Sequence, residues 1–124
     1  PFDFKTPNTL KSGFESGFNQ LEMFGGYDHN FVIDGIAFRK FATVKGDKTG
    51  HVMECFTDLP GVQLYTGNFI DEERICKNGA KYKVHQGLCL ETQYFPNALE
   101  LTHFPSPILR AGEKYDTVTE YKFK

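Results

Sequence analysis

The chain has 124 residues and a net charge of −2, and 24% of its residues are charged. This length is enough for one domain of ordinary size. The charge balance offers no basic patch for nucleic acid and no polybasic anchor for a membrane, and no apolar run approaches the roughly 20 residues of a spanning helix. We therefore expect neither a nucleic-acid partner nor a membrane partner.

The cysteines and the first residue bear on the origin of the chain. Three cysteines at wide spacing do not make a disulfide framework. Cys55 and Cys89 lie in apolar strand patterns and are expected to be buried free thiols, whereas Cys76 lies in a loop-like segment that could expose it. This pattern indicates a reducing compartment, and we expect the cytoplasm. The chain begins at Pro1 without a Met, which indicates a piece of a longer protein or a processed product.

The first third of the chain contains few regular elements. Residues 1–25 carry scattered Pro, Gly and Phe, so this segment is predicted to be irregular, with one short helix near Thr9–Ser12. Phe31–Ile33 is a short apolar run, and Asp34-Gly35 marks a turn after it.

Strand patterns then follow one another. Ile36–Lys45 alternates in hydropathy from its first residue and is predicted to pair with Val52–Thr57 through a polar hairpin loop at residues 46–50. Val62–Thr66 also alternates, and Ile70–Tyr82 is predicted to be a charged loop.

Three prolines between Pro96 and Pro107 enforce an extended, non-helical path. A final strand is predicted over Tyr115–Phe123, where every second residue shares one face. Five or six strands, turn signals at short intervals and no long helix predict an all-β sandwich.

The stretch His85–Gln93 carries the most unusual chemistry in the chain. Cys89, Glu91 and Gln93 share one face of a predicted strand, and Leu88, Leu90 and Thr92 share the other. A buried glutamate in an apolar strand would hold its proton more tightly, which suits a general base. The alternative is a glutamate that faces water at a strand end.

Four blocks resemble the C-terminal part of the aldose 1-epimerase family, whose members are also called galactose mutarotases. The resemblance implies a large antiparallel β-sandwich of the galactose mutarotase type, of which residues 1–124 would be the C-terminal segment of a single domain, without its N-terminal part. The resemblance is dense from about Gly26 onward and thin before it. The blocks are GYDHNF (26–31), PGVQLYTGNF (60–69), HQGLCLETQ (85–93) and FPSPILRAGEKY (104–115).

The resemblance also implies an activity and three site residues. Mutarotation of galactose or glucose needs a base at the C1 hydroxyl and an acid at the ring oxygen, and needs no metal, nucleotide or other cofactor. By resemblance Glu91 is the catalytic base, and Asp28 and Gln63 bind the sugar. Without the resemblance, Asp28 would be a turn residue that caps Asn30, and Gln63 an outward strand residue.

The acid in the family is a histidine, assisted by a second histidine and an arginine, all from the N-terminal part. His29, His51, His85 and His103 do not match these positions. We therefore expect the chain alone to be inactive and the N-terminal part of the same enzyme to be its partner, together with a monosaccharide substrate.

Other classes stay open from the sequence. One is a non-catalytic carbohydrate-binding or structural sandwich that lacks the acid histidine. Another is a glycosidase with Asp28 and Glu91 as paired carboxylates, for which their separation would be decisive. The acidic run Asp71–Glu73 could suggest a cation site, but adjacent acids point in different directions, so a solvated loop is the better interpretation.

Overall fold

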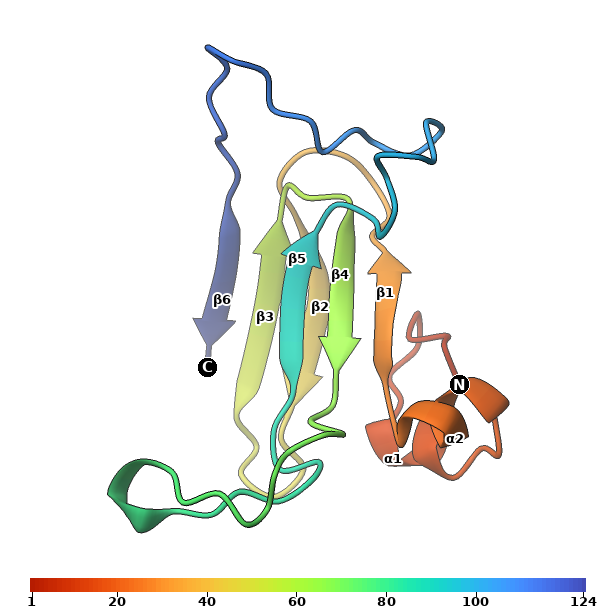
Figure 1. The fold of residues 1–124 in the computed structure, drawn as a ribbon. Helices are drawn as coiled ribbons and strands as arrows, with labels where there is room; N and C mark the ends of the chain where they lie inside the picture. Colours follow the sequence, from red (N-terminus) through yellow and green to blue (C-terminus); the bar gives the residue numbers. More distant parts are fainter. The chain divides into compact units, whose positions relative to one another are not determined.

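A computed structural model describes all residues from Pro1 to Lys124. The chain forms two compact units, one made of Pro1–His29 and Leu64–Leu90, the other of Asn30–Gln63 and Glu91–Lys124. The elements, in chain order, are α1 (Leu10–Phe14), α2 (Asn19–Phe24), β1 (Asp28–Val32), β2 (Arg39–Lys45), β3 (Val52–Thr57), β4 (Gly61–Tyr65), the short 3₁₀ helix η1 (Lys77–Gly79), β5 (Cys89–Gln93) and β6 (Thr119–Phe123) (Figure 1).

The strands form two three-stranded sheets, with orders β1-β4-β5 and β2-β3-β6. Within the second sheet both pairings are antiparallel, and the all-β prediction is confirmed. β2 differs from its predicted form because it begins at Arg39 and because its register to β3 shifts between Lys40 and Ala42. Such a bulge breaks the two-residue period, so the unbroken alternation predicted from Ile36 is wrong. The last strand is also shorter than predicted and begins at Thr119.

In the second unit, three threonine hydroxyls connect the two sheets. Thr57 is fully buried, and its Oγ1 donates to the carbonyl of Val118 at 3.1 Å and lies 3.2 Å from Oγ1 of Thr119. Oγ1 of Thr119 lies 2.6 Å from Oγ1 of Thr92 on β5. Because Thr92 and Thr119 belong to different sheets, this contact places one face of each sheet against the other, as in a sandwich.

The other face of β2-β3-β6 is charged. Glu54 on β3 forms ion pairs with Lys124 at 2.6 Å and Lys40 at 3.3 Å. Hydrogen bonds from Lys124 and then Lys40 lower the pKa of Glu54. The ammonium of Lys122 lies 4.8 Å from the ring centre of Phe56. A face of this composition is compatible with contact to water.

The guanidinium of Arg39 donates hydrogen bonds to several backbone carbonyls of the second unit. A planar fork with five N–H donors can bind several carbonyls at once, and here it replaces partners that the irregular backbone lacks. The acceptors are the carbonyls of Thr57 (3.0 Å), Leu59 (2.9 Å), Ala37 (3.0 Å), Asp34 (3.2 Å) and Ile33 (3.3 Å).

The first unit contains the two helices. Oγ1 of Thr9 accepts from the amide of Ser12 at 3.2 Å and caps α1, which confirms the predicted short helix. α2 was not predicted. It has no side-chain cap at its start. It ends at Gly25, whose φ of 66° lies in the left-handed region. Leu21 is its buried residue. Neither helix has the length and apolar character that a membrane crossing would need.

Tyr27 is the core of the first unit. It is fully buried, and its hydroxyl donates to the carbonyl of Pro1 at 2.7 Å. A side chain at Gly13 would collide with that hydroxyl. The amide and carbonyl of Tyr27 both bond to Thr66, which joins the start of β1 to the end of β4.

The cysteines divide by strand face. Cys55 is buried, as predicted, and burial raises the pKa of its thiol. The prediction that Cys89 is buried is wrong, because Cys89 is exposed. It shares a β5 face with Glu91, opposite to the face on which Thr92 meets the second sheet.

The exposed apolar side chains of β6 predict that the isolated chain self-associates. Phe123 is 74% exposed and Tyr121 is 41% exposed, on the strand face that continues the buried face of β3. Exposed apolar patches on an edge strand promote association. Purified residues 1–124 should therefore elute as oligomers or aggregates in size exclusion with light scattering.

The variant Phe123→Ser should shift this material toward the monomer, since it removes the largest exposed apolar group of that face. Lys122→Ser is the matched control on the opposite face of the same strand and should not. A wild-type chain that stays monomeric at micromolar concentration would contradict the expectation.

Candidate functional site

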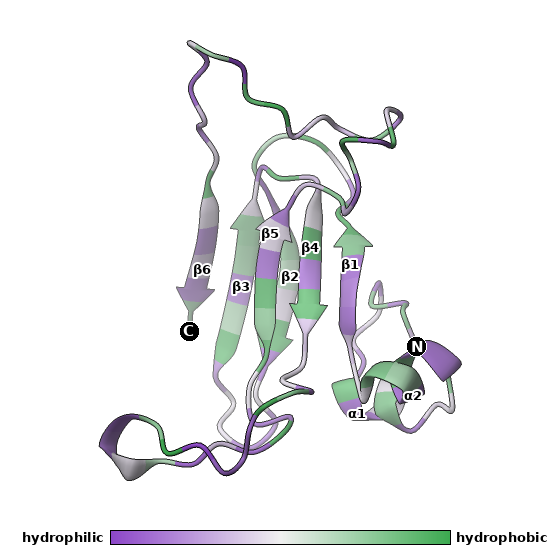
Figure 2. Cartoon of the chain, in the orientation of Figure 1, coloured by the Kyte–Doolittle hydropathy of each residue, from purple (hydrophilic) through white to green (hydrophobic).

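The middle strand of the first sheet, β4, has two chemically different faces. Val62 and Leu64 are buried, and alternation places Gly61 and Gln63 on the other face. Figure 2 shows this change of hydropathy along β4 and β5. The buried pair anchors β4, and the opposite face is left for polar groups.

The neighbouring strand β5 shows the same division. Thr92 contacts Thr119 of the second sheet, so Glu91 and Gln93 project away from that sheet. The side chain of Glu91 is exposed and that of Gln93 is partly buried. Of the two arrangements considered for Glu91, the buried carboxylate is therefore not the one observed in this chain, and the carboxylate is accessible.

A hydrogen bond over Gly61 defines the polar face of the second unit. Nε2 of Gln93 donates to Oδ1 of Asn30 at 3.1 Å. A Cβ at Gly61 would lie 2.7 Å from the same Oδ1, so Asn30 extends over the glycine. Asn30, Gly61 and Gln93 thus share one face, and alternation along β4 and β5 adds Gln63 and Glu91 to it. The structure brings together two of the three predicted site residues on this face.

Asp28 belongs to the first unit. It is the first residue of β1, so the alternative placement in a turn is wrong. Its backbone amide donates to Nδ1 of His29 at 3.0 Å, and its side chain is partly buried. Along β1 it lies on the same strand face as Asn30.

The histidines have local structural partners. Nδ1 of His29 accepts a hydrogen bond, so the neutral ring carries its proton on Nε2, which is buried without a partner. Burial lowers the pKa of His29, and the charge of Asp28 raises it in part. Nε2 of His85 donates to the carbonyl of Gly25 at 2.8 Å, and its ring stacks on Phe14 at 4.5 Å.

His51 and His103 are exposed. That the general acid is a histidine from the N-terminal part of the enzyme, and not one of these four, stays a prediction.

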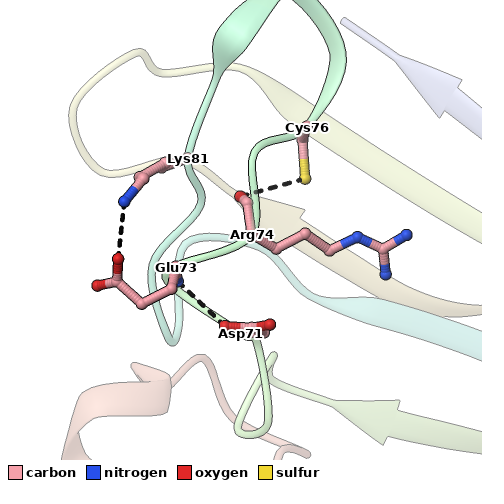
Figure 3. Close-up of polar contacts among 5 residues, drawn as sticks. All are labelled: Asp71, Glu73, Arg74, Cys76 and Lys81. Atoms are coloured by element: carbon pink, nitrogen blue, oxygen red, sulfur yellow. Dashed lines mark hydrogen bonds and ion pairs between the residues drawn. The ribbon is translucent and has the colours of Figure 1, made fainter.

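The acidic side chains of the loop after β4 have their partners within the same loop (Figure 3). Glu73 forms an ion pair with Lys81 at 2.8 Å, and its amide donates to Oδ1 of Asp71 at 3.1 Å. Glu72 accepts from the amide of Val84 at 2.9 Å. No group of three or more His, Cys, Asp or Glu side chains converges as a metal site would require. The three carboxylates thus have separate partners, namely one lysine and two backbone amides.

An open cavity of about 310 Å³ lies in the first unit, lined by Ile70, Tyr82, Gln86 and Gly87. It includes none of the predicted site residues. Asn30, Gly61 and Gln93 were also missed from the sequence. Their place in the GYDHNF, PGVQLYTGNF and HQGLCLETQ blocks was the available signal, together with the two-residue spacing of Gln93 from Glu91.

The family model for aldose 1-epimerase matches residues 1–122. Galactose mutarotases from Bos taurus and Homo sapiens are each 48% identical to this chain over 99 residues, which cover 79% of this chain and 29% of each relative. Aldose 1-epimerase from Escherichia coli (strain K12) is 31% identical over 126 residues, covering 98% of this chain and 36% of the relative.

The chain therefore spans about a third of the length of the curated relatives that it matches. The family match extends over both units and all six strands. It includes the polar face with Gln63 and Glu91 as well as the segment with Asp28. On this basis, the chain belongs to the aldose 1-epimerase family.

Proposed function

We propose that this chain is the C-terminal segment of a single-domain aldose 1-epimerase, which interconverts the α and β anomers of galactose or glucose. The family match carries the proposal. The relatives are named as mutarotases or epimerases, which are isomerases acting on a sugar. The accessible carboxylate of Glu91 on a polar sheet face is compatible with this chemistry.

In the proposed reaction, Glu91 removes the proton from the C1 hydroxyl while an acid gives a proton to the ring oxygen. The bond from C1 to the ring oxygen breaks, and C1 becomes an aldehyde carbon. Rotation about the C1–C2 bond presents the other face of the aldehyde, and the reverse proton transfers close the ring. No net proton or electron is exchanged, so one base and one acid on opposite sides of C1 are sufficient.

Gln63 and Asp28 have the proposed role of binding the sugar. Gln63 shares the polar face with Glu91, and its amide can both donate to and accept from hydroxyl groups. Asp28 can only accept when ionised. Such bonds hold C1 near the base, which lowers the entropy cost of the proton transfer.

The acid is proposed to come from the N-terminal part of the same polypeptide. Nε2 of His85 donates a hydrogen bond to the carbonyl of Gly25. The ring of His29 packs against those of Phe2 and Phe24, with 4.7 Å and 5.8 Å between ring centres. Both rings therefore already have structural partners within the first unit. A histidine acid with a second histidine and an arginine, as the family resemblance implies, would then complete the site.

The three free cysteines favour a reducing compartment. We propose the cytoplasm as the location.

Glu91→Gln, made in the full-length polypeptide that carries this chain, should slow mutarotation about 10²–10⁴-fold, because it removes the general base and leaves an amide of the same shape. Polarimetry with freshly dissolved α-galactose measures the rate. Glu15→Gln, on the exposed surface of α1, is the control and should be unchanged. A Glu91→Gln enzyme within about threefold of wild type would refute the assignment.

Asp28→Ala and Gln63→Ala should both weaken galactose binding in isothermal titration calorimetry. A lost bond to a neutral hydroxyl costs about 0.5–1.5 kcal/mol, and more when the partner is charged, so Asp28→Ala should have the larger effect. Normal galactose affinity in both variants would remove these residues from the site.

A further inference from the structure

Two amide side chains on the polar face of the second unit have no role in the proposed reaction. Asn30 on β1 and Gln93 on β5 lie on strands separated by β4. Neighbouring strands are about 4.8 Å apart, so the two backbones are about 10 Å apart. Side chains of this length can meet across a middle strand only where that strand carries no side chain in the way.

Gly61 provides this opening. Nε2 of Gln93 reaches Oδ1 of Asn30 at 3.1 Å, and a Cβ at Gly61 would lie 2.7 Å from that oxygen. Real Cβ atoms essentially never lie this close to a non-bonded heavy atom, so an alanine at position 61 would displace the side chain of Asn30. The φ of Gly61 is not positive, so the requirement for glycine at this position is one of space.

The ring of Phe95 also lies over Gly61. The Cβ built at Gly61 would lie 2.9 Å and 3.0 Å from two atoms of the Phe95 ring. That ring packs edge-on against Phe104, with 5.1 Å between centres. Asn30 and Phe95 therefore both occupy the space over Gly61 that a side chain at this position would need.

The bridge lies beside both proposed site residues of this unit. Gln93 is the next residue after Glu91 on the same face of β5. The amide of Ile33 donates to the carbonyl of Pro60 at 2.9 Å. Counting from that pair along the antiparallel strands places Asn30 opposite Gln63. The bond from Gln93 to Asn30 thus ties the strand of the base to a neighbour of the sugar-binding amide.

We propose that Asn30 and Gln93 are positioning residues of the mutarotase site, and that their hydrogen bond over Gly61 holds the carboxylate of Glu91 in place relative to Gln63. This inference rests on the proposed function. Neither amide transfers a proton. Their effect is to restrict the position of the base, and small misplacements of a catalytic group lower the rate strongly.

The test uses steady-state mutarotation by the full-length polypeptide, with galactose as substrate. Asn30→Leu and Gln93→Leu keep the approximate side-chain size and remove the bond. Each should lower kcat about 10–100-fold and change KM by less than about threefold. The kcat of the double variant should lie within about twofold of the kcat of the slower single variant, because both substitutions remove the same interaction.

Asn30→Asp keeps an acceptor oxygen for Gln93, so its kcat at high pH should stay within about fivefold of the wild-type value. The added negative charge disfavours ionisation of a neighbouring carboxyl, so the acidic limb of the pH profile should move to higher pH in this variant alone. Gly61→Ala, which changes no polar group, should reproduce the loss of kcat seen in Gln93→Leu.

Thr92→Val is the matched control. It removes a hydrogen bond from the same strand, but on the opposite face, toward Thr119. It should lower the Tm and leave kcat within about twofold. The inference is overturned if the Asn30 and Gln93 variants affect kcat no more than Thr92→Val does, or if their effects add.

Two comparisons separate this inference from the proposed function. An active wild type, an inactive Glu91→Gln and a Gln93→Leu with normal kcat would overturn the positioning role alone. A folded wild type that does not accelerate mutarotation would overturn both.

Discussion

The structure depends on one strand having two unlike faces. Val62 and Leu64 of β4 are buried, and the transfer of such side chains from water stabilises the fold by about 1.5–3 kcal/mol each. Since β4 is the middle strand of its sheet, this burial leaves its second face directed away from the core. Gly61 and Gln63 occupy that face, so the same alternation that anchors β4 also places the partly buried Gln63 on the side away from the core.

The polar face combines accessibility with restraint. The carboxylate of Glu91 is exposed, as a group that receives a proton from a sugar hydroxyl must be. The nearby amides of Asn30 and Gln93 are held by their hydrogen bond, for which Gly61 leaves the space. A pre-arranged polar surface loses less entropy when it binds a flexible hydroxylated ligand. The hydroxyl contact between Thr92 and Thr119 lies on the opposite face of β5, toward the second sheet.

The differences between prediction and structure have separate physical causes. α2 has no capping side chain at its start, so the sequence carries no start signal for it. It ends at the left-handed Gly25, but the Gly-Gly pair at this point is equally typical of a simple turn. The bulge in β2 is a shift of pairing, which hydropathy along one strand does not encode. The apolar neighbours of Cys89 predict a buried thiol, but its exposure is set by which side of β5 meets the second sheet.

The sequence by itself determined the all-β class, most strand positions and the family, because alternation and turn residues are local and the four blocks that carry the resemblance are long. It also identified Gln63 and Glu91 as residues of interest. Only the tertiary structure decided that these two share one face and that Asn30 meets Gln93 over Gly61. The reason is that strand pairing joins residues distant in sequence, here 30 with 93, and the space between them depends on a third strand.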